Sequence, residues 1–273
     1  MQAASRESYR AGAERLDAYV RGAEPSAVAS TADDILSVAA LLRREPRLRR
    51  ALSDPARAGA DRAGLLGDML GGRIGAEALD LLTSMVSGRW SVPSELLDGV
   101  ERLGVEALLA SADLAGDLGE VEDELFRFGQ VVSGSAELSN TLSDPMAPVQ
   151  RRAELAQHLL AGKAQPVTVR LVETALAGFG GRSFTGALTR LVELAADRRD
   201  RQVAYVTVAA PLTEEEERRL GVRLSQMYGR EVSVKQTVDP DVLGGVRVRV
   251  GSDLYDGTVL RRLNETRNAL AKR

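Results

Sequence analysis

The stretch Arg201-Gln-Val-Ala-Tyr-Val-Thr-Val-Ala-Ala-Pro211, followed by Leu212-Thr-Glu-Glu-Glu-Glu217, carries the strongest fold signal in the chain. The apolar run at 203–210 is rich in β-branched residues and stops at a proline, which has no N–H to donate to a sheet, so it predicts a strand. Thr213 stands three positions before Glu216, which is the capping-box arrangement that starts a helix. We therefore expect a strand that is followed at once by a helix.

Two more strands and a second helix are expected downstream. Residues 231–238 alternate apolar and polar side chains, and residues 246–250 follow the order Val-Arg-Val-Arg-Val, so both segments predict half-buried strands. The paired glycines Gly244-Gly245 lead into the second of these strands, and a turn at 251–257 carries the chain to a last helix that starts at Thr258. The order strand–helix–strand–strand–helix predicts a small βαββα domain.

Several short motifs in this segment occur together in one known protein family. The motifs are Val206-Thr-Val-Ala-Ala-Pro-Leu212, Val238-Asp-Pro240, Leu243-Gly-Gly-Val246 and Asp256-Gly-Thr258, with Leu263 beyond them. In this order and spacing they resemble the C-terminal signature of the delta subunit of bacterial F-type ATP synthases, whose mitochondrial counterpart is the oligomycin-sensitivity-conferring protein. The resemblance marks a set of structural signature residues, namely Asp239, Pro240, Gly244, Gly245, Asp256, Gly257 and Thr258. The family favours Ser at the last of these positions, and threonine keeps the capping hydroxyl.

The composition of the chain excludes several classes of function. Its 273 residues are 44% hydrophobic but only 4% aromatic, which suits helix packing around Leu, Val and Ala. The net charge of −3 argues against a dedicated nucleic-acid binder, which needs a basic surface. Because the chain has no cysteine, disulfides and thiolate metal sites are excluded. No apolar run approaches the roughly 18 residues of a membrane span, and no signal-peptide core follows the N-terminus, so we expect contact with a membrane only through partners.

A helical pattern occurs twice before the C-terminal segment. Leu48-Arg-Arg-Ala-Leu-Ser-Asp-Pro55 is echoed about 90 residues later by Leu138-Ser-Asn-Thr-Leu-Ser-Asp-Pro145, and Arg62-Ala-Gly-Leu65 is echoed by Arg152-Ala-Glu-Leu155. The spacing of apolar residues predicts helices at 5–20, 32–42, 58–70, 76–86 and 93–109. Two copies are too few for a solenoid, so we expect two related helical bundles.

We therefore predict an α+β chain, mainly of helical bundles, in three domains. The first helical domain is expected at 1–112, the second at 113–200, and the C-terminal α/β domain at 201–273. The second helical domain resembles the N-terminal domain of the delta family, and the extra copy resembles the long delta form of actinobacteria. Each Leu-Ser-Asp-Pro is interpreted as a helix end followed by a helix start, since Ser and Asp side chains can accept from free backbone N–H groups.

The sequence offers no recognisable catalytic, cofactor-binding or metal-binding residues. His158 is the only histidine, and without a second imidazole or a thiolate it is expected on a helix surface rather than in a zinc site. Gly178-Phe-Gly-Gly-Arg-Ser183 lacks the ending and the preceding strand of a phosphate loop, so it is expected to join two helices.

The acidic run Glu214–Glu217 is attributed to favourable charge at a helix N-terminus. Arg198–Arg201 is expected to be a solvated patch, with an acidic partner as the alternative. The sole tryptophan, Trp90, is expected to fill a core between helices, with an interface anchor as the alternative.

The resemblance implies a non-catalytic subunit of the peripheral stalk on the cytoplasmic face of the bacterial cell membrane. In the family, the helical domain grips the N-terminal segments of the alpha subunits, and the C-terminal domain holds the end of the b subunit, while the beta subunits are reached only through the head. The stalk resists rotation, so that proton transport stays coupled to ATP synthesis. For the b contact we single out residues of the last turn and helix, namely Leu254, Tyr255, Leu260, Leu263 and Leu270, although Leu263 and its neighbours could equally pack only against the small sheet.

Two other classes of function remain open at this stage. A generic helical adaptor would share the repeat but has no reason to carry the C-terminal motifs. A nucleic-acid module could use Arg247 and Arg249, yet the domain offers only Tyr205, Tyr228 and Tyr255 for base stacking. The sequence also leaves open which helical copy binds alpha chains and which form the b partner takes.

Overall fold

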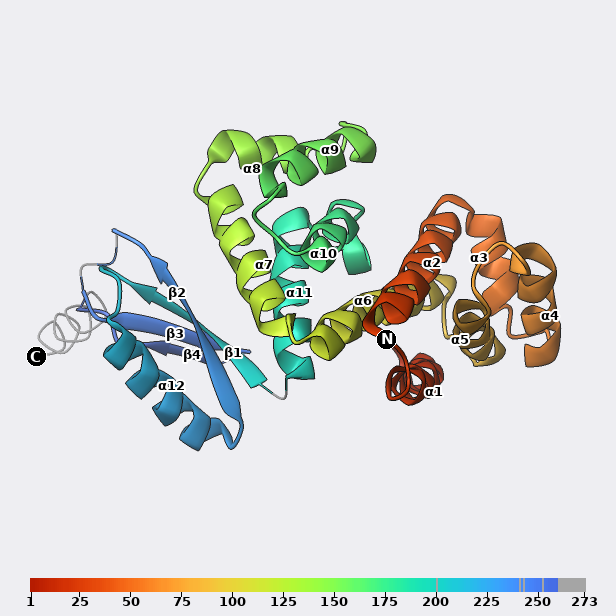
Figure 1. Cartoon of the computed structure of the whole chain (residues 1–273), viewed down its shortest axis with the longest axis horizontal. Coiled ribbons are helices and arrows are strands. Elements are labelled where there is room, and N and C mark those ends of the chain that lie inside the picture. Colours follow the sequence, from red (N-terminus) through yellow and green to blue (C-terminus); the bar gives the residue numbers. More distant parts are fainter. Residues whose placement is uncertain (200, 241, 243, 252, 260–273) are drawn as a thin grey trace, which may run out of the picture.

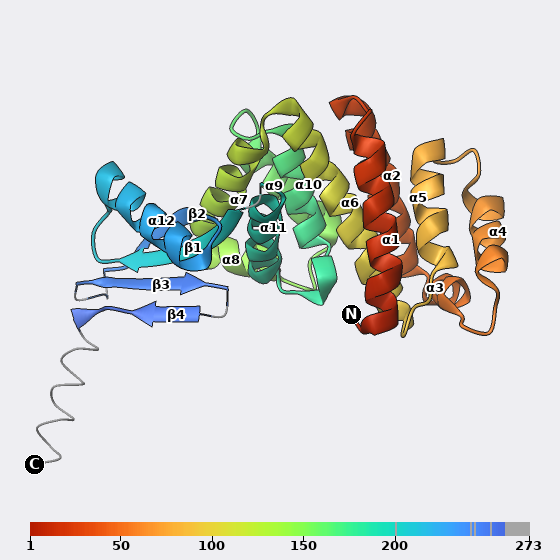
Figure 2. The ribbon, with the colours of Figure 1, turned by 90° about the horizontal axis from the view of Figure 1, so that it is seen from below.

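The computed structural model describes residues 1–199, 201–240, 242, 244–251 and 253–259. Within them the chain forms two groups of helices and a four-stranded sheet that carries one further helix (Figure 1). The sheet and the first helical group lie at opposite ends of an elongated molecule, and the second helical group lies between them (Figures 1 and 2). This architecture confirms the predicted α+β class.

The bounds of the elements are as follows. The first helical group contains α1 (Ala3–Val20), α2 (Pro25–Arg44), α3 (Pro46–Ser53), α4 (Gly59–Leu70), α5 (Ala76–Ser87) and α6 (Pro93–Ala115). The second contains α7 (Leu118–Ser133), α8 (Ala136–Ser143), α9 (Val149–Leu160), α10 (Pro166–Leu176), the 3-10 turn η1 (Phe179–Gly181) and α11 (Phe184–Arg198). The C-terminal part contains β1 (Arg201–Val208), α12 (Glu214–Tyr228), β2 (Glu231–Val238), β3 (Val246–Val250) and β4 (Asp253–Asp256).

The two helical groups repeat the same local structures. Helices α3 and α8 each have eight residues, and helices α4 and α9 each have twelve. In both Leu-Ser-Asp-Pro motifs the aspartate, Asp54 or Asp144, accepts a hydrogen bond of 2.9 Å from the backbone N–H two residues further on. The serine behaves differently from expectation, because the hydroxyl of Ser53 donates to the carbonyl of Arg49 (2.9 Å) instead of accepting from a free N–H. The aspartate therefore shapes the turn in both motifs, and in the first motif Ser53 bonds back to the preceding helix.

Three helices differ from the sequence-based expectation. Helix α2 begins at Pro25 and not at residue 32, because proline is tolerated in the first helical turn, where its missing N–H leaves nothing unbonded. Helix α3 was not predicted, because its eight residues are fewer than the window over which a helical period is recognised in a sequence. Helix α6 runs beyond the expected 109 to Ala115, where Gly116 at φ 83° ends it in a conformation that favours glycine.

A single buried hydrophobic cluster runs through both helical groups. Helix α6 lies at its centre, with α2 packed along it from the first group and α10 and α11 from the second. The approach of α2 is close, because a Cβ atom at Gly104 would lie only 2.7 Å from the side chain of Leu36. The position 112 at which the sequence suggested a domain boundary falls inside α6. The two helical groups therefore share this helix.

Helix α2 is the one helix in the described part of the chain that is long and apolar enough, by length and composition, to cross a membrane. Its apolar stripe of Val28, Ala32, Ile35 and Leu42 is buried in the shared core. Asp33 on the same helix pairs with Arg170 of α10. We therefore assign α2 as a core helix of the helical groups.

The strand order in the sheet is β2-β1-β3-β4, with β1 parallel to β2 and the other pairs antiparallel. Helix α12 covers one face of this sheet, where Leu224 packs with Val206 and Val248. The predicted capping box is confirmed, because the N–H of Glu216 donates to the hydroxyl of Thr213 (3.3 Å) and the N–H of Thr213 donates to the carboxylate of Glu216 (2.9 Å). Strands β1, β2 and β3 and helix α12 were all expected from their sequence patterns.

Strand β4 was missed, so the predicted order βαββα is wrong at this point. Residues 253–256 were expected as part of a turn, but they pair antiparallel with β3. Their sequence, Asp-Leu-Tyr-Asp, is too short to show alternation and has aspartate, a poor strand former, at both ends. Most of the final helix that was predicted to follow Thr258 lies outside the described residues.

Candidate interaction site

The face of the sheet opposite α12 packs against the second helical group. The ring centroid of Tyr205 in β1 lies 6.3 Å from that of Phe126 in α7, and its hydroxyl donates to the carbonyl of Thr189 in α11 (3.5 Å). Val203, two residues earlier in β1, belongs to the helical core. Burial raises the pKa of Tyr205, so its hydroxyl stays a neutral donor. Strand β1 thus joins the sheet to the helices through apolar and aromatic packing.

Glu122 of α7 is the centre of an ion network across this junction. Its side chain is 0% exposed, and its carboxylate accepts from Arg199 Nη1 at 2.9 Å, from Lys235 Nζ at 2.8 Å and from Ser233 Oγ at 2.9 Å. Lys235 also pairs with the half-exposed Asp123. Helix α7, the end of α11 and strand β2 therefore meet at one carboxylate. Because removal of one partner of a buried ion pair leaves an uncompensated charge, this network should hold the domains in one arrangement.

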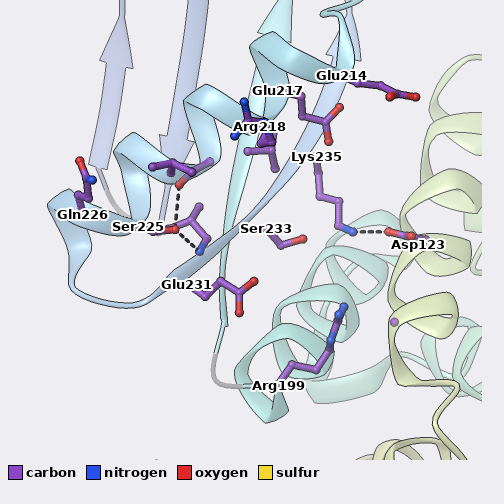
Figure 3. A pocket seen from close by; sticks show the side chains of 15 residues that line it. Asp123, Arg199, Glu214, Glu217, Arg218, Ser225, Gln226, Glu231, Ser233 and Lys235 are labelled. Carbon is purple, nitrogen blue, oxygen red and sulfur yellow. Dashed lines mark hydrogen bonds and ion pairs between the residues drawn. The ribbon is translucent and has the colours of Figure 1, made fainter.

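An open cleft of about 850 Å³ lies beside the network, between α7, α12 and β2 (Figure 3). In Figure 3 Lys235 extends from β2 toward Asp123 on α7, and Arg199 reaches in from the end of α11. The cations in the wall are engaged by neighbouring carboxylates, since Arg218 pairs with Glu215 at 2.6 Å. Within the described residues, no group of three or more histidine, aspartate and glutamate side chains could hold a metal ion. The cleft has the properties of a solvated crevice between two domains.

A second cleft of about 660 Å³ opens on the other side of the same junction. The signature residues Asp239 and Pro240 line it at the end of β2. Gln130 of α7 closes one side by donating to the carbonyl of Gln236 (2.8 Å) and to Thr237 Oγ1 (3.0 Å). These signature residues therefore lie where the sheet meets the helices.

The paired glycines of the signature pack against its last motif. Gly245 has a φ of 82°, and a Cβ atom there would lie 2.4 Å from the oxygen of Gly257 and 2.9 Å from the Cα of Thr258. The carbonyl of Gly244 accepts from the N–H of Val259 (3.0 Å). Two motifs that are separate in sequence are thus one structure, and only glycine fits at 245 without rearrangement.

The last motif is held by its own hydrogen bonds. Asp256 Oδ1 accepts from the N–H of Thr258 (3.0 Å), and its other carboxylate oxygen lies 3.7 Å from Arg247. The side chain of Thr258 is buried. These contacts hold the backbone in one conformation directly after β4.

The two described residues that were singled out for a b contact lie on the edge strand β4. Leu254 is 60% exposed and Tyr255 is 44% exposed. As neighbours in a strand they point to opposite faces of the sheet. The register places Leu254 beside Arg249, while the hydroxyl of Tyr255 accepts from that of Tyr228 (3.2 Å) on the α12 side. The other candidates, Leu260, Leu263 and Leu270, lie outside the described residues.

Other residues that the sequence singled out have structural roles. His158 is exposed on α9, Glu214–Glu217 form the first turn of α12, and Trp90 is buried, with its indole N–H donating to the carbonyl of Met85 (2.8 Å). These three expectations are confirmed. The glycine loop does join α10 to α11, and the N–H of Gly180 donates to the carboxylate of Glu101 (3.0 Å).

The expectation of a solvated arginine patch at 198–201 is wrong for two of its members. Arg199 binds the buried Glu122, and Arg198 pairs with Asp113 of α6 at 3.2 Å. Glu122 and Lys235 were not expected at a junction from the sequence. Lys235 is one of only three lysines in the chain, and a lysine between valine and glutamine in a predicted strand was the available signal.

Comparison with known proteins identifies the family of the chain. The sequence profile of the ATP synthase delta (OSCP) subunit family matches residues 105–270. The chain belongs to this family. It is 81% identical to the ATP synthase subunit delta of Salinispora arenicola and 78% identical to that of Salinispora tropica, over 100% of each chain. It is 45% identical to the protein of the same name from Streptomyces griseus, over 99% of this chain and 100% of the relative.

A chain of the Toxoplasma gondii mitochondrial ATP synthase hexamer gives a TM-score of 0.38 at 17% identity, covering 61% of this chain and 94% of that one, which is too weak to carry an argument. Membership of the delta family makes the chain a non-catalytic subunit, in agreement with the sequence-based expectation. The family profile begins within α6, so helices α1–α5 lie outside it. The relatives match the whole chain, so they share the first helical group.

Proposed function

We propose that the chain is a stator subunit of the peripheral stalk, linking the alpha/beta head of an F-type ATP synthase to the membrane-anchored b subunit on the cytoplasmic face of the cell membrane. The observation that carries the proposal is the 81% identity, over the full length of both chains, to a protein named ATP synthase subunit delta. The task is mechanical. A subunit that holds the head against rotation keeps proton translocation coupled to ATP synthesis.

The proposal assigns a task to each of the three predicted domains. The helical domains at 1–112 and 113–200 would grip the N-terminal segments of alpha subunits, since helical bundles can accept an amphipathic helix in a groove. The C-terminal domain at 201–273 would hold the b subunit. Two features support the transmission of force between them, namely the core shared around α6 and the buried Glu122 network.

The b contact is proposed at β4 and the segment that follows it. Strand β4 is the edge of the sheet, and an edge strand with exposed apolar side chains offers a surface for a partner. Because Leu254 and Tyr255 point to opposite faces, a partner that touches both must straddle this edge. Leu260 and Leu263 complete the proposed region.

The proposal is tested by purification of the tagged chain from native membranes under conditions that keep the synthase intact. The expected result is recovery of alpha, beta and b subunits in stoichiometric amounts. A generic adaptor would instead recover other proteins, and recovery of no synthase subunit from membranes that contain intact synthase would contradict the proposal.

A further inference from the structure

Two adjoining pockets of about 360 and 330 Å³ open on the first helical group, at the end of the molecule away from the sheet (Figure 1). They are formed by α3, the turn that follows it, the start of α4 and the loop between α5 and α6. Ser53, Pro55 and Trp90 line both pockets, and Trp90 is only 4% exposed. The floor is therefore already packed, and the charged side chains around the pockets determine what can bind there.

Positive charge is in clear excess around the two pockets. Their lining holds one carboxylate, that of Asp54, and four guanidinium groups, those of Arg50, Arg57, Arg62 and Arg89. Residues 44–62 and 88–92, which contain this lining with its flanks, have seven arginines and three carboxylates in all. The first carboxylate beyond them on α6, that of Glu95, is paired with the N-terminal ammonium at 3.5 Å. This end of the molecule is thus basic, although the whole chain has a net charge of −3.

Most of these cations have no anionic partner. Arg44, Arg47, Arg50 and Arg89 are exposed, and none of them forms an ion pair within the described residues. Arg50 donates only to the carbonyl of Pro46, at 3.3 Å. Arg57 is 51% exposed and lies 3.8 Å from Asp54, which is a long distance for an ion pair. The guanidinium groups at this end are therefore available to carboxylates from outside the chain.

The second helical repeat shows that the fold does not need these arginines. Helix α8 lies 90 residues after α3, has the same length and ends in the same aspartate turn. At the positions of Arg47, Arg50, Arg57 and Arg89 the second repeat has other residues, namely Glu137, Asn140, Ala147 and Phe179. Because the same local structure forms without the positive charge, the charge on α3 and its surroundings points to a contact with another molecule.

The arrangement of the arginines favours an extended anionic partner. Arg47 and Arg50 lie on α3, Arg57 lies in the turn before α4, and Arg89 lies in the loop after α5. A small anion can meet only part of this surface, whereas a segment with several carboxylates can meet all of it. Guanidinium groups bind carboxylates through two parallel hydrogen bonds, which makes an acidic peptide a good match.

We propose that this end of the first helical group binds an acidic polypeptide segment of another synthase subunit, with Arg47, Arg50, Arg57 and Arg89 as its cationic contacts. The inference rests on the proposed function and adds the surface and the chemistry of its partner. A contact made by exposed charges is screened by salt, so its strength should fall steeply with ionic strength.

The test uses a full-length triple variant, Arg47→Glu/Arg50→Asn/Arg57→Ala, in which each new residue is the one that the second repeat has at the equivalent position. The tagged chain is titrated onto synthase membranes from which the native subunit has been stripped, at low and at high salt. We expect the triple variant to bind about tenfold more weakly than wild type at low salt, with a smaller difference at high salt. Circular dichroism should show that it is folded.

The matched control is Arg127→Glu/Arg151→Asn/Lys163→Ala, which removes the same charge from exposed positions of the second helical group. It should bind like wild type. If the triple variant binds as well as wild type, or if only the control is weakened, the inference is wrong while the proposed function stands. If wild type does not bind stripped membranes at all, both are wrong.

A second variant, Arg47→Lys/Arg50→Lys, identifies the partner. It keeps the charge and supplies two amines, which a water-soluble carbodiimide joins directly to carboxylates, whereas the arginines of the wild type do not react. We expect a new cross-link, absent from the wild type, to a segment rich in aspartate and glutamate in another synthase subunit. No new cross-link from a variant that binds like wild type would overturn the inference. Binding of wild type to synthase-free vesicles of phosphatidylglycerol and cardiolipin that the triple variant loses would also overturn it, because the partner would then be lipid.

Discussion

The buried guanidinium of Arg62 connects the end of α5 with the turn before α4 in the first helical repeat. Its guanidinium donates to the carbonyls of Val86 (2.8 Å), Ser87 (3.1 Å) and Gly88 (2.8 Å) at the end of α5, and to those of Asp54 (2.9 Å) and Arg57 (2.5 Å) before α4. The equivalent residue in the second repeat, Arg152, makes one such bond, to the carbonyl of Leu142 (3.0 Å), and its buried Nε has no partner within the described residues. The two equivalent arginines therefore make very different numbers of hydrogen bonds to backbone carbonyls in their repeats.

The first prediction compares Arg62→Met with the matched variant Arg152→Met. The loss of five bonds to partly buried carbonyls should lower the free energy of unfolding by about 3–5 kcal/mol for Arg62→Met and by about 1–2 kcal/mol for Arg152→Met. Urea unfolding of the first repeat is followed by the fluorescence of the sole tryptophan, and that of the whole chain by circular dichroism. Equal losses for the two variants would show that the additional bonds of Arg62 contribute nothing.

The second prediction concerns the signature glycine at 245. Gly245→Ala places a Cβ atom 2.4 Å from the oxygen of Gly257 at a φ of 82°, whereas Gly251→Ala has a φ of 56° and no atom within 4 Å of its Cβ. We expect Gly245→Ala to lower the melting temperature of the C-terminal domain well below that of Gly251→Ala, which carries the backbone strain without the clash. Similar melting temperatures would show that close packing of the two motifs is not the reason for the glycine.

At the scale of elements, the junction between the second helical group and the sheet is built from contacts of two kinds. Strand β1 supplies aromatic packing through Tyr205, and strand β2 supplies charge through Lys235, which is only 7% exposed. Both strands meet the same helix, α7. Since α12 covers the other face of the sheet, the helical group takes the place of a second layer for the C-terminal domain.

The third prediction is that Glu122→Gln loosens this junction. The change leaves Arg199 facing a neutral amide and leaves Lys235 with only the half-exposed Asp123, and loss of the buried partner of an ion pair is destabilising by about 3–5 kcal/mol. Amide hydrogen exchange in β2 should become at least about tenfold faster, while exchange in α2 and α6 stays unchanged. Asp123→Asn is the control, because its carboxylate is 59% exposed and screened by water. Equal exchange rates in the two variants would contradict a central role for Glu122.

The elements that could be predicted from the sequence are those with a strong local pattern. The capping box at Thr213, the alternation in β3 and the repeated Leu-Ser-Asp-Pro motifs each depend on residues only a few positions apart. Strand β4 could not be predicted because four residues carry too little periodicity, and it exists through its pairing with β3.

The junction could not be predicted for a related reason. Glu122 and Lys235 lie on different domains, and no local sequence pattern around either residue indicates that the two form an ion pair. The seven signature residues were found from the resemblance, but the reason for Gly245 became clear only when the structure brought it against Gly257. Long-range pairing and close approach of backbones are properties of the folded chain.

At the scale of the whole molecule, the chain is an elongated body in which each part is fixed to the next. Helix α6 is shared by the two helical groups, and Arg43 of α2 joins them again by donating to Gly178 (3.4 Å) and pairing with Glu101. The Glu122 network then fixes the sheet to the second group. These connections are what the proposed stator function requires, because a load can then pass along the molecule without one part moving against the next.

The proposed stator function is tested by comparing ATP hydrolysis with ATP-driven proton pumping in membranes stripped of this subunit. We expect stripped membranes still to hydrolyse ATP but no longer to pump protons, and we expect the added purified chain to restore pumping. Proton pumping that persists at the original ratio to hydrolysis, in membranes shown by immunoblotting to lack the subunit, would contradict the stator function.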